Sequence, residues 1–308
     1  SWLHTPQGHE VIDGVIYAKD WSAIIFNPSF PYRFSHMLLA SGLTASFLIA
    51  GLSAYRLLIG DNKIAPKLAL KTATYTAAVL IPLQILAGDM HGLNTLEHQP
   101  QKVAAMEGVW ETEQGAPLLL FAIPDEQERT NHAELAIPNL ASFILTHELN
   151  GEIKGLNEFR GEHPPVAPVF YSFREMVGMG VLMLFAAWAG SYYLLRRGEL
   201  PDWLGKLFIA MSFSGWVATL AGWYVTEVGR QPYLVSGVLR TADAVTGLPP
   251  QNIGLSFALY AVIYAVLMVA YIRTLTLMCR KSVGIEEISK GDADERHTNK
   301  LDIASSNA

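Results

Sequence analysis

The sequence predicts an all-α fold, a polytopic bundle of membrane helices, and two observations carry this prediction. Of the 308 residues, 51% are hydrophobic and only 16% are charged, whereas soluble domains carry about 25% charged residues. Five apolar runs also reach the roughly 20 residues that a bilayer crossing needs, and each can satisfy its own backbone there only as a helix. The five runs are 36–59, 68–89, 168–195, 203–228 and 253–279.

These runs divide the chain into five parts in order. Residues 1–35 form an outer approach segment, and 36–89 hold the first two membrane helices. A polar insertion follows over 90–167, and 168–279 hold the third to fifth helices. The polar tail 280–308 is expected to be disordered. The first residues, S-W-L-H-T-P-Q-G-H-E, read as the interior of a longer protein.

Composition excludes several functions. The net charge of −6 provides no basic surface for nucleic acid. A single cysteine, Cys279, excludes an intramolecular disulfide and a cysteine-based zinc or iron–sulfur site within this chain.

The basic residues predict how the helices are oriented. Lys and Arg gather in cytoplasmic connections, and here they follow the first, third and fifth runs, whereas the insertion is acidic. We therefore expect the N-terminus of the chain and the insertion outside the membrane and the C-terminus in the cytoplasm. The basic residues are Arg56, Lys63, Lys67, Lys71, Arg196, Arg197, Lys206, Arg280 and Lys281.

Five polar or sulfur-bearing side chains are expected at one depth near the outer membrane face. His36 begins the first run, Arg174 and Met176 lie near the start of the third, and Glu227 and Arg230 end the fourth. Taken singly, each has an ordinary interpretation as an interfacial, packing or snorkelling residue. Ionisable groups within membrane helices are nevertheless costly and indicate function by default, so their coincidence favours a site.

The chemistry that fits this set is haem binding. His36 and Met176 could clamp one low-spin iron, whose potential a thioether ligand raises. The carboxylate of Glu227 suits a five-coordinate, high-spin iron with a face open to a gas. Arg174 and Arg230 could pair with haem propionates. The other histidines are expected in connections or tails, which disfavours a bis-histidine site.

The insertion carries a second candidate site. Lys102, Glu107 and Trp110 are predicted on or beside a short amphipathic helix lying against the membrane surface. A quinol needs an apolar bed, a hydrogen-bond donor and a proton acceptor, and these side chains offer all three. A solvated charged turn is the alternative. Asp89 and His91, at the junction, are proton-exit or structural candidates.

Four segments together resemble subunit I of the cytochrome bd quinol oxidases. They are R-F-S-H-M at 33–37, Q-P-Q-K-V-A-A-M-E-G-V-W-E-T at 99–112, F-R-E-M-V at 173–177 and G-W-Y-V-T-E-V-G-R-Q-P-Y at 222–233. The resemblance covers all but the last part of the chain. It implies a terminal respiratory oxidase of the bacterial inner membrane that oxidises quinol and reduces dioxygen to water.

The resemblance also implies cofactors and partners. His36 and Met176 would be the axial ligands of a low-spin haem b, with Arg174 beside it. Glu227 would belong to a high-spin pair, formed by haem b and either haem d or a further haem b. Lys102 and Glu107 would belong to the quinol site. A second subunit and a small single-helix subunit would complete the complex.

Three departures from the family pattern leave alternatives open. The chain corresponds to the C-terminal two-thirds of the subunit, so part of the oxygen site is expected elsewhere. The short insertion is similar to that of the short-loop branch, which includes cyanide-insensitive oxidases, and Tyr233 stands where many relatives have Trp. The alternatives are a haem-binding, quinol-oxidising anchor without oxygen reduction, and a transporter gated by Glu227 and Arg230.

Overall fold

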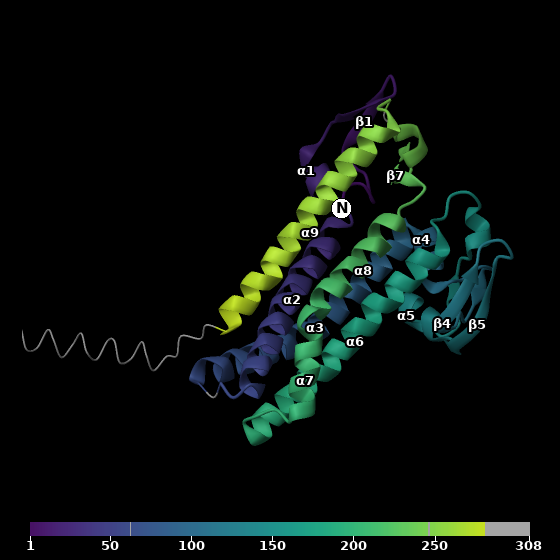
Figure 1. The fold of residues 1–308 in the computed structure, drawn as a ribbon. Coiled ribbons are helices and arrows are strands. Elements are labelled where there is room, and N and C mark those ends of the chain that lie inside the picture. The colour runs from purple at the N-terminus through teal and green to yellow at the C-terminus, as the bar shows by residue number, and fades with distance from the viewer. Residues whose placement is uncertain (62, 246, 281–308) are drawn as a thin grey trace, which may run out of the picture. The chain divides into compact units, whose positions relative to one another are not determined.

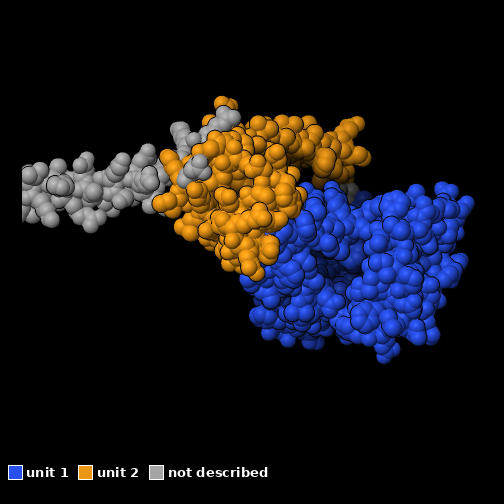
Figure 2. Space-filling view, turned by 90° about the horizontal axis from the view of Figure 1, so that it is seen from below, with its two compact units in different colours: residues 1–46, 76–189, 213–245 blue, residues 47–75, 190–212, 246–308 orange. Residues whose placement is uncertain are grey.

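The computed structural model describes residues 1–280 except 62 and 246. Within these limits the chain divides into two compact units, shown in different colours in Figure 2. Unit 1 comprises 1–46, 76–189 and 213–245, and unit 2 comprises 47–75, 190–212 and 246–308. All the candidate site residues named above belong to unit 1. The expected tail, 280–308, lies outside the described residues from 281 onward.

Long helices dominate the described chain, which confirms the predicted all-α membrane bundle (Figure 1). Five helical segments of the described residues are long and apolar enough to cross a membrane. Their helices are α2 (Phe30–Leu58), α3 (Ile64–His98), α6 (Val166–Arg197), α7 (Asp202–Ala210) with α8 (Ser214–Val228), and α9 (Pro250–Arg280). A 3₁₀ turn at Met211–Phe213 separates α7 from α8, within the run expected to be one helix.

Two helices are longer than the hydropathy of the sequence predicted. Helix α2 begins at Phe30, inside the expected approach segment, and α3 continues to His98, well into the expected insertion. Hydropathy follows lipid-like composition, whereas a helix continues as long as its backbone is hydrogen-bonded. As a result His91 lies on a helix of membrane length and not in a connection.

Short elements fill the remaining described chain. The helices are α1 (Trp21–Ile25), α4 (Pro100–Glu107) and α5 (Leu140–Thr146), with 3₁₀ turns at Leu156–Phe159 and Thr241–Ala244. Eight strands form four two-stranded antiparallel sheets. They are β1 (His9–Ile12) with β2 (Val15–Ala18), β3 (Glu113–Gln114) with β6 (Glu152–Ile153), β4 (Leu118–Asp125) with β5 (Thr130–Ile137), and β7 (Tyr233–Val235) with β8 (Leu239–Arg240).

Helix α4 has clear local start and stop signals. Pro100 occupies its first turn, where no backbone N–H is needed. Gly108 ends it with φ of 71°, in the left-handed region that glycine adopts without a steric penalty, and its N–H donates to the Ala104 carbonyl. The helix is therefore fixed to eight residues.

The same helix lies at the centre of unit 1. Six of its eight residues are buried, from Lys102 to Glu107. One side of α4 packs into a cluster with α6 and α8, formed by Ala104, Ala105, Met106, Trp110, Leu156, Val166, Val169 and Val225. Its other side packs with the insertion, in a cluster of Val103, Val109, Ala116, Ala141, Leu145 and Ile153. The predicted short helix is therefore present, but it is buried within unit 1 and does not present its polar side chains on a surface.

Unit 2 contains the end of α2, the start of α3, the end of α6 and all of α7. Its packing is close where Gly190 meets the ring of Phe208, because a Cβ atom added to this glycine would lie only 2.9 Å from that ring. Phe208 also packs against Phe47, with ring centroids 5.9 Å apart. Its helix α9 has no buried residue in its apolar window, as far as the described chain extends.

Candidate functional site

Glu227 and Arg230 lie one helical turn apart where α8 ends. Arg230 donates from Nη2 to Glu227 Oε2 and from Nη1 to the Leu234 carbonyl. The arginine side chain is buried, at 7% exposed, whereas the glutamate is 39% exposed. One carboxylate oxygen is therefore held by the arginine, and the remainder of the group is accessible.

Lys102 is buried beside this pair, at 2% exposed. Its Nζ donates to Gln99 Oε1 at 2.7 Å, to the Thr226 carbonyl at 3.3 Å and to His4 Nδ1 at 3.3 Å. Three acceptors match the three N–H groups of an ammonium. Burial lowers the pKa of Lys102 well below its ordinary value, Arg33 and Arg230 lower it further, and Glu227 opposes them.

His4 lies between Lys102 and Glu227, and no pattern in the sequence indicated its role. Its Nδ1 accepts from Lys102, while its Nε2 lies 3.8 Å from Glu227 Oε1. Burial and the neighbouring Lys102 lower the pKa of His4, so the ring is neutral. The contact with Lys102 spans 98 positions of sequence, and no local pattern could have identified it.

Glu107 and Arg174 form a second, more deeply buried pair. Arg174 Nη2 donates to Glu107 Oε2 at 3.0 Å, Nε donates to the Leu119 carbonyl at 2.9 Å, and Nη1 donates to the Met106 carbonyl. The side chain of Glu107 is only 5% exposed and that of Arg174 only 15%. Burial raises the pKa of the Glu107 carboxyl, and Arg174 opposes that rise.

Trp110 lies inside the apolar cluster that also holds α4. Its ring is 6% exposed, and its Nε1 donates to Asn131 Oδ1 at 2.9 Å. Asn131 in turn donates to the Gly108 carbonyl. The tryptophan therefore anchors the insertion to α4 and offers no exposed surface for a ring to rest on.

His36 faces α3. Gln84 Nε2 lies 3.1 Å from its Nε2, and the ring of His91 lies 5.7 Å away, centroid to centroid. His91 Nε2 is buried and has no hydrogen-bond partner in the described part of the chain. The sequence argument against a second histidine therefore fails, because α3 extends far enough to carry His91 beside His36.

Met176 faces α8. A Cβ on Gly222 would lie 2.9 Å from Met176 Sδ, so any larger residue at position 222 would displace the sulfur from its present place. His36 has a similar neighbour, since a Cβ on Gly88 would lie 3.4 Å from its Nε2. Both candidate axial ligands thus lie beside a glycine, although they pack against different helices.

The residues present fit a haem with its propionates. Arg33, Lys102 and Arg230 interact electrostatically around the single carboxylate of Glu227, an excess of positive charge. Arg33 Nε and Arg230 Nε are buried without hydrogen-bond partners among the residues described. Anionic carboxylates on a ligand would satisfy both guanidiniums. Arg33 is a further candidate that the sequence analysis did not select.

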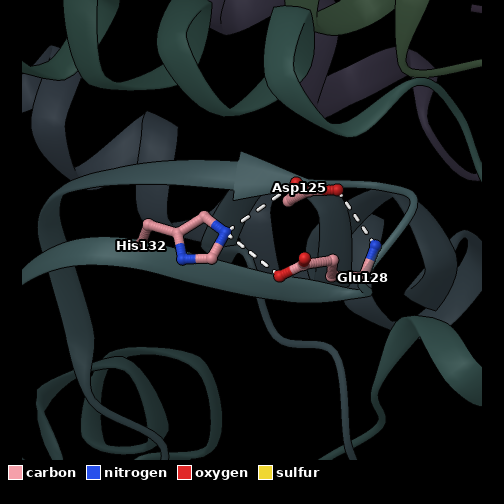
Figure 3. A group of neighbouring side chains, drawn as sticks. All are labelled: Asp125, Glu128 and His132. Carbon is pink, nitrogen blue, oxygen red and sulfur yellow. Dashed lines mark hydrogen bonds and ion pairs between the residues drawn. The ribbon is translucent and has the colours of Figure 1, made fainter.

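One acidic cluster outside this region has a simpler explanation. Asp125, Glu128 and His132 lie at the turn between β4 and β5, with one candidate ligand atom from each within 4.8 Å of the others (Figure 3). Asp125 Oδ1 accepts the backbone N–H of Gln127 and Glu128, and these bonds lower its pKa. Because the group is largely exposed and the aspartate already caps the turn, it indicates local structure.

Five helical segments of membrane length among the described residues, together with the charged side chains of Lys102, Glu107 and Arg230 buried beside them, are typical of an integral membrane protein with an internal charged site. The family model for cytochrome bd terminal oxidase subunit I matches residues 1–283. The chain belongs to this family, as its resemblance predicted.

Similar proteins support the same assignment. The chain is 31% identical over 311 residues to cytochrome bd ubiquinol oxidase subunit 1 of Bacillus subtilis strain 168, covering 96% of this chain and 64% of that protein. It is 27% identical over 343 residues to cytochrome bd-II ubiquinol oxidase subunit 1 of Escherichia coli K12, covering 88% and 66%. The chain therefore spans just under two thirds of these relatives.

A solved structure has the same fold. The bd oxidase from Geobacillus thermodenitrificans is similar with a TM-score of 0.82 and 31% identity, over 92% of this chain and 65% of that one. The family is one of multi-pass bacterial membrane proteins with haem cofactors, which confirms those broader predictions.

Proposed function

We propose that this chain is part of a terminal respiratory oxidase that oxidises membrane quinol and reduces dioxygen to water. Its family membership supports an oxidoreductase of the respiratory chain. The complete activity would need the longer subunit, a second subunit and a small single-helix subunit. The basic connections predict that the insertion, which holds the proposed quinol residues, lies outside the membrane. Protons from quinol would therefore be released outside.

The observation that carries this proposal is that α4, which carries the proposed quinol residues, contacts both segments that hold proposed haem ligands. Lys102, near its start, donates to the carbonyl of Thr226, directly before Glu227. Glu107, at its end, pairs with Arg174, two residues before Met176. One eight-residue helix therefore links the proposed quinol groups to both proposed haem-ligand segments. A short, rigid connection suits electron transfer from one site to the next.

The residues have the following proposed roles. His36 and Met176 would hold a low-spin haem b. Glu227 would belong to the site of a high-spin pair, formed by haem b and either haem d or a further haem b. These haems supply one-electron transfer and oxygen chemistry when bound. Arg230 and Arg33 offer their unsatisfied Nε–H groups to propionates. A transporter gate would use Glu227 and Arg230 but would not need Met176 packed beside Gly222, so this arrangement favours a haem site over a transporter.

In quinol oxidation, the chain would supply a hydrogen-bond donor and a proton acceptor. Lys102 donates to one quinol oxygen, exchanging one of its present acceptors for the substrate. Glu107, whose pKa burial raises, accepts a proton from the site and remains oriented by Arg174. Both groups are buried in the free chain, so quinol binding would require α4 or the neighbouring insertion to shift.

Visible spectroscopy and oxygen uptake test this function directly. The complete oxidase, isolated in detergent, should show low-spin and high-spin haem bands in a reduced-minus-oxidised spectrum and should consume oxygen with a quinol donor. A spectrum without haem would favour the transporter. Haem bands with quinol oxidation, but without oxygen uptake, would favour the non-catalytic anchor.

The proposed iron ligands His36 and Met176 need a matched pair of variants, because His91 lies beside His36. Met176→Leu should abolish the low-spin bands or shift their potential, whereas His91→Leu should leave both unchanged. The reverse result would assign a bis-histidine site and contradict the role of Met176. His36→Leu should remove the low-spin bands in either case.

A further inference from the structure

We infer that His4 is a positioning residue that links the quinol-side lysine, Lys102, to the haem-side carboxylate, Glu227. This inference rests on the proposed function of Glu227 as a haem ligand. The imidazole offers an acceptor on one side and a donor on the other, and the two groups it joins lie on different elements, α4 and α8.

With Lys102 as an ammonium, its hydrogen bonds assign the tautomer of His4. All three N–H groups of the ammonium have acceptors, of which His4 Nδ1 is one. A neutral imidazole that accepts at Nδ1 carries its proton on Nε2. That N–H lies 3.8 Å from Glu227 Oε1, the oxygen that Arg230 does not hold.

The backbone holds His4 firmly in this position. Its own carbonyl accepts from Gln99 Nε2 at 3.3 Å, and the carbonyl of Leu3 accepts from the N–H of Ser236 at 2.9 Å. The hydroxyl of Thr5 donates to Asn27 Oδ1 at 3.0 Å. Contacts on both sides of His4 therefore orient the ring, which is 4% exposed.

The surroundings of His4 are otherwise cationic. Lys102, Arg33 and Arg230 act on it electrostatically, and Glu227 is the carboxylate in contact with it. A neutral ring adds no further positive charge, yet its Nε2–H faces the carboxylate at 3.8 Å, and the two would hydrogen-bond if they moved slightly closer. Partners that hydrogen-bond a metal-bound group orient it and tune the metal, typically with 10–100-fold effects.

Three variants of the complete oxidase test this link. His4→Gln keeps an acceptor and a donor on one amide, so quinol kcat/KM and the potential of the Glu227-dependent haem should stay within about twofold of the parent. His4→Phe keeps the ring shape without either group. It should lower kcat/KM about tenfold and lower that haem's potential by about 59 mV, the one-electron equivalent of tenfold. The potential falls because a carboxylate that loses a donor stabilises ferric iron more.

His4→Asn separates the two contacts and serves if the phenylalanine variant does not fold. Its shorter amide still reaches Lys102 but not Glu227, so the potential should fall while the KM for quinol is retained. His132→Phe, a change of an exposed histidine in β5, is the matched control and should alter neither value. Equal potentials and equal kcat/KM in His4→Phe, His4→Gln and the parent would overturn the inference.

Glu227→Ala distinguishes failure of this link from failure of the proposed function. Loss of high-spin bands in Glu227→Ala, with no effect of any His4 variant, would overturn the link and leave the haem assignment intact. Unchanged bands in Glu227→Ala would overturn the haem assignment and the link with it.

Discussion

The two carboxylate–arginine pairs at the candidate sites of unit 1 differ in how completely they are enclosed. Arg174 uses three donors on Glu107, Leu119 and Met106, and neither side chain of its pair exceeds 15% exposure. Arg230 keeps an unpartnered buried Nε within the described chain, and the carboxylate of Glu227 is 39% exposed. The first pair is complete within this chain, whereas the second has unused capacity on both partners.

This difference separates a positioning role from a ligand-binding role. Glu107 and Arg174 form a closed pair, which fixes α4 against α6 and can hold or release a proton without binding anything further. Glu227 and Arg230 form an open pair. An open pair has a carboxylate oxygen and a guanidinium N–H that still need partners. Sequence spacing could not make this distinction, since it assigned Glu107 to the candidate quinol site and Arg174 to the candidate haem site and did not predict that they pair.

The open pair should show the largest functional effect. Glu227→Ala in the complete oxidase should remove high-spin haem bands and reduce quinol-dependent oxygen uptake by at least about 100-fold, because a ligand is lost and not only oriented. Spectra and oxygen uptake measure both. Retained bands with reduced uptake would make the glutamate a proton carrier, and the contrast between the two pairs would fail.

The closed pair should dominate stability. Arg174→Leu leaves the Glu107 charge buried without its partner, and the expected loss is about 3–5 kcal/mol. Thermal unfolding in detergent measures this loss. The double variant Arg174→Leu with Glu107→Gln should recover most of the stability, since it removes both charges. A double variant as unstable as the single one would mean that packing of Arg174 over Phe170, and not the charge, stabilises the site.

The helices and the polar groups of both pairs were predictable, but their partners were not. Apolar runs of membrane length identified the five spans, because lipid demands a helix. The burial of α4 was missed, since Lys102 and Glu107 read as surface charges until tertiary contacts satisfied them. His4 and Arg33 were missed because their contacts reach far along the chain. The β4–β5 hairpin was not predicted, because its residues do not alternate clearly between apolar and polar and the insertion as a whole reads as a polar loop.

The closed pair should also control the pH dependence of quinol oxidation. Burial raises the pKa of Glu107, so the carboxyl is protonated, and unable to accept a proton, below that raised value. Quinol kcat/KM should therefore fall as pH decreases through it, by up to tenfold per pH unit for a single proton. Glu107→Gln should be slower and lack this acidic limb. A limb that persists in Glu107→Gln would assign it to another group.

An exposed pair completes the comparison and should show the smallest effect. Arg240 Nη2 lies 3.4 Å from Glu162 Oε1, with the side chains 47% and 55% exposed. Solvent screens such pairs, so Arg240→Gln and Glu162→Gln should each change the unfolding free energy by less than about 1 kcal/mol. The effect should shrink further in high salt. Thermal unfolding at two salt concentrations measures it. A loss equal to that of Arg174→Leu would mean that burial does not set the strength of these pairs, because all three have the same chemistry and differ mainly in enclosure.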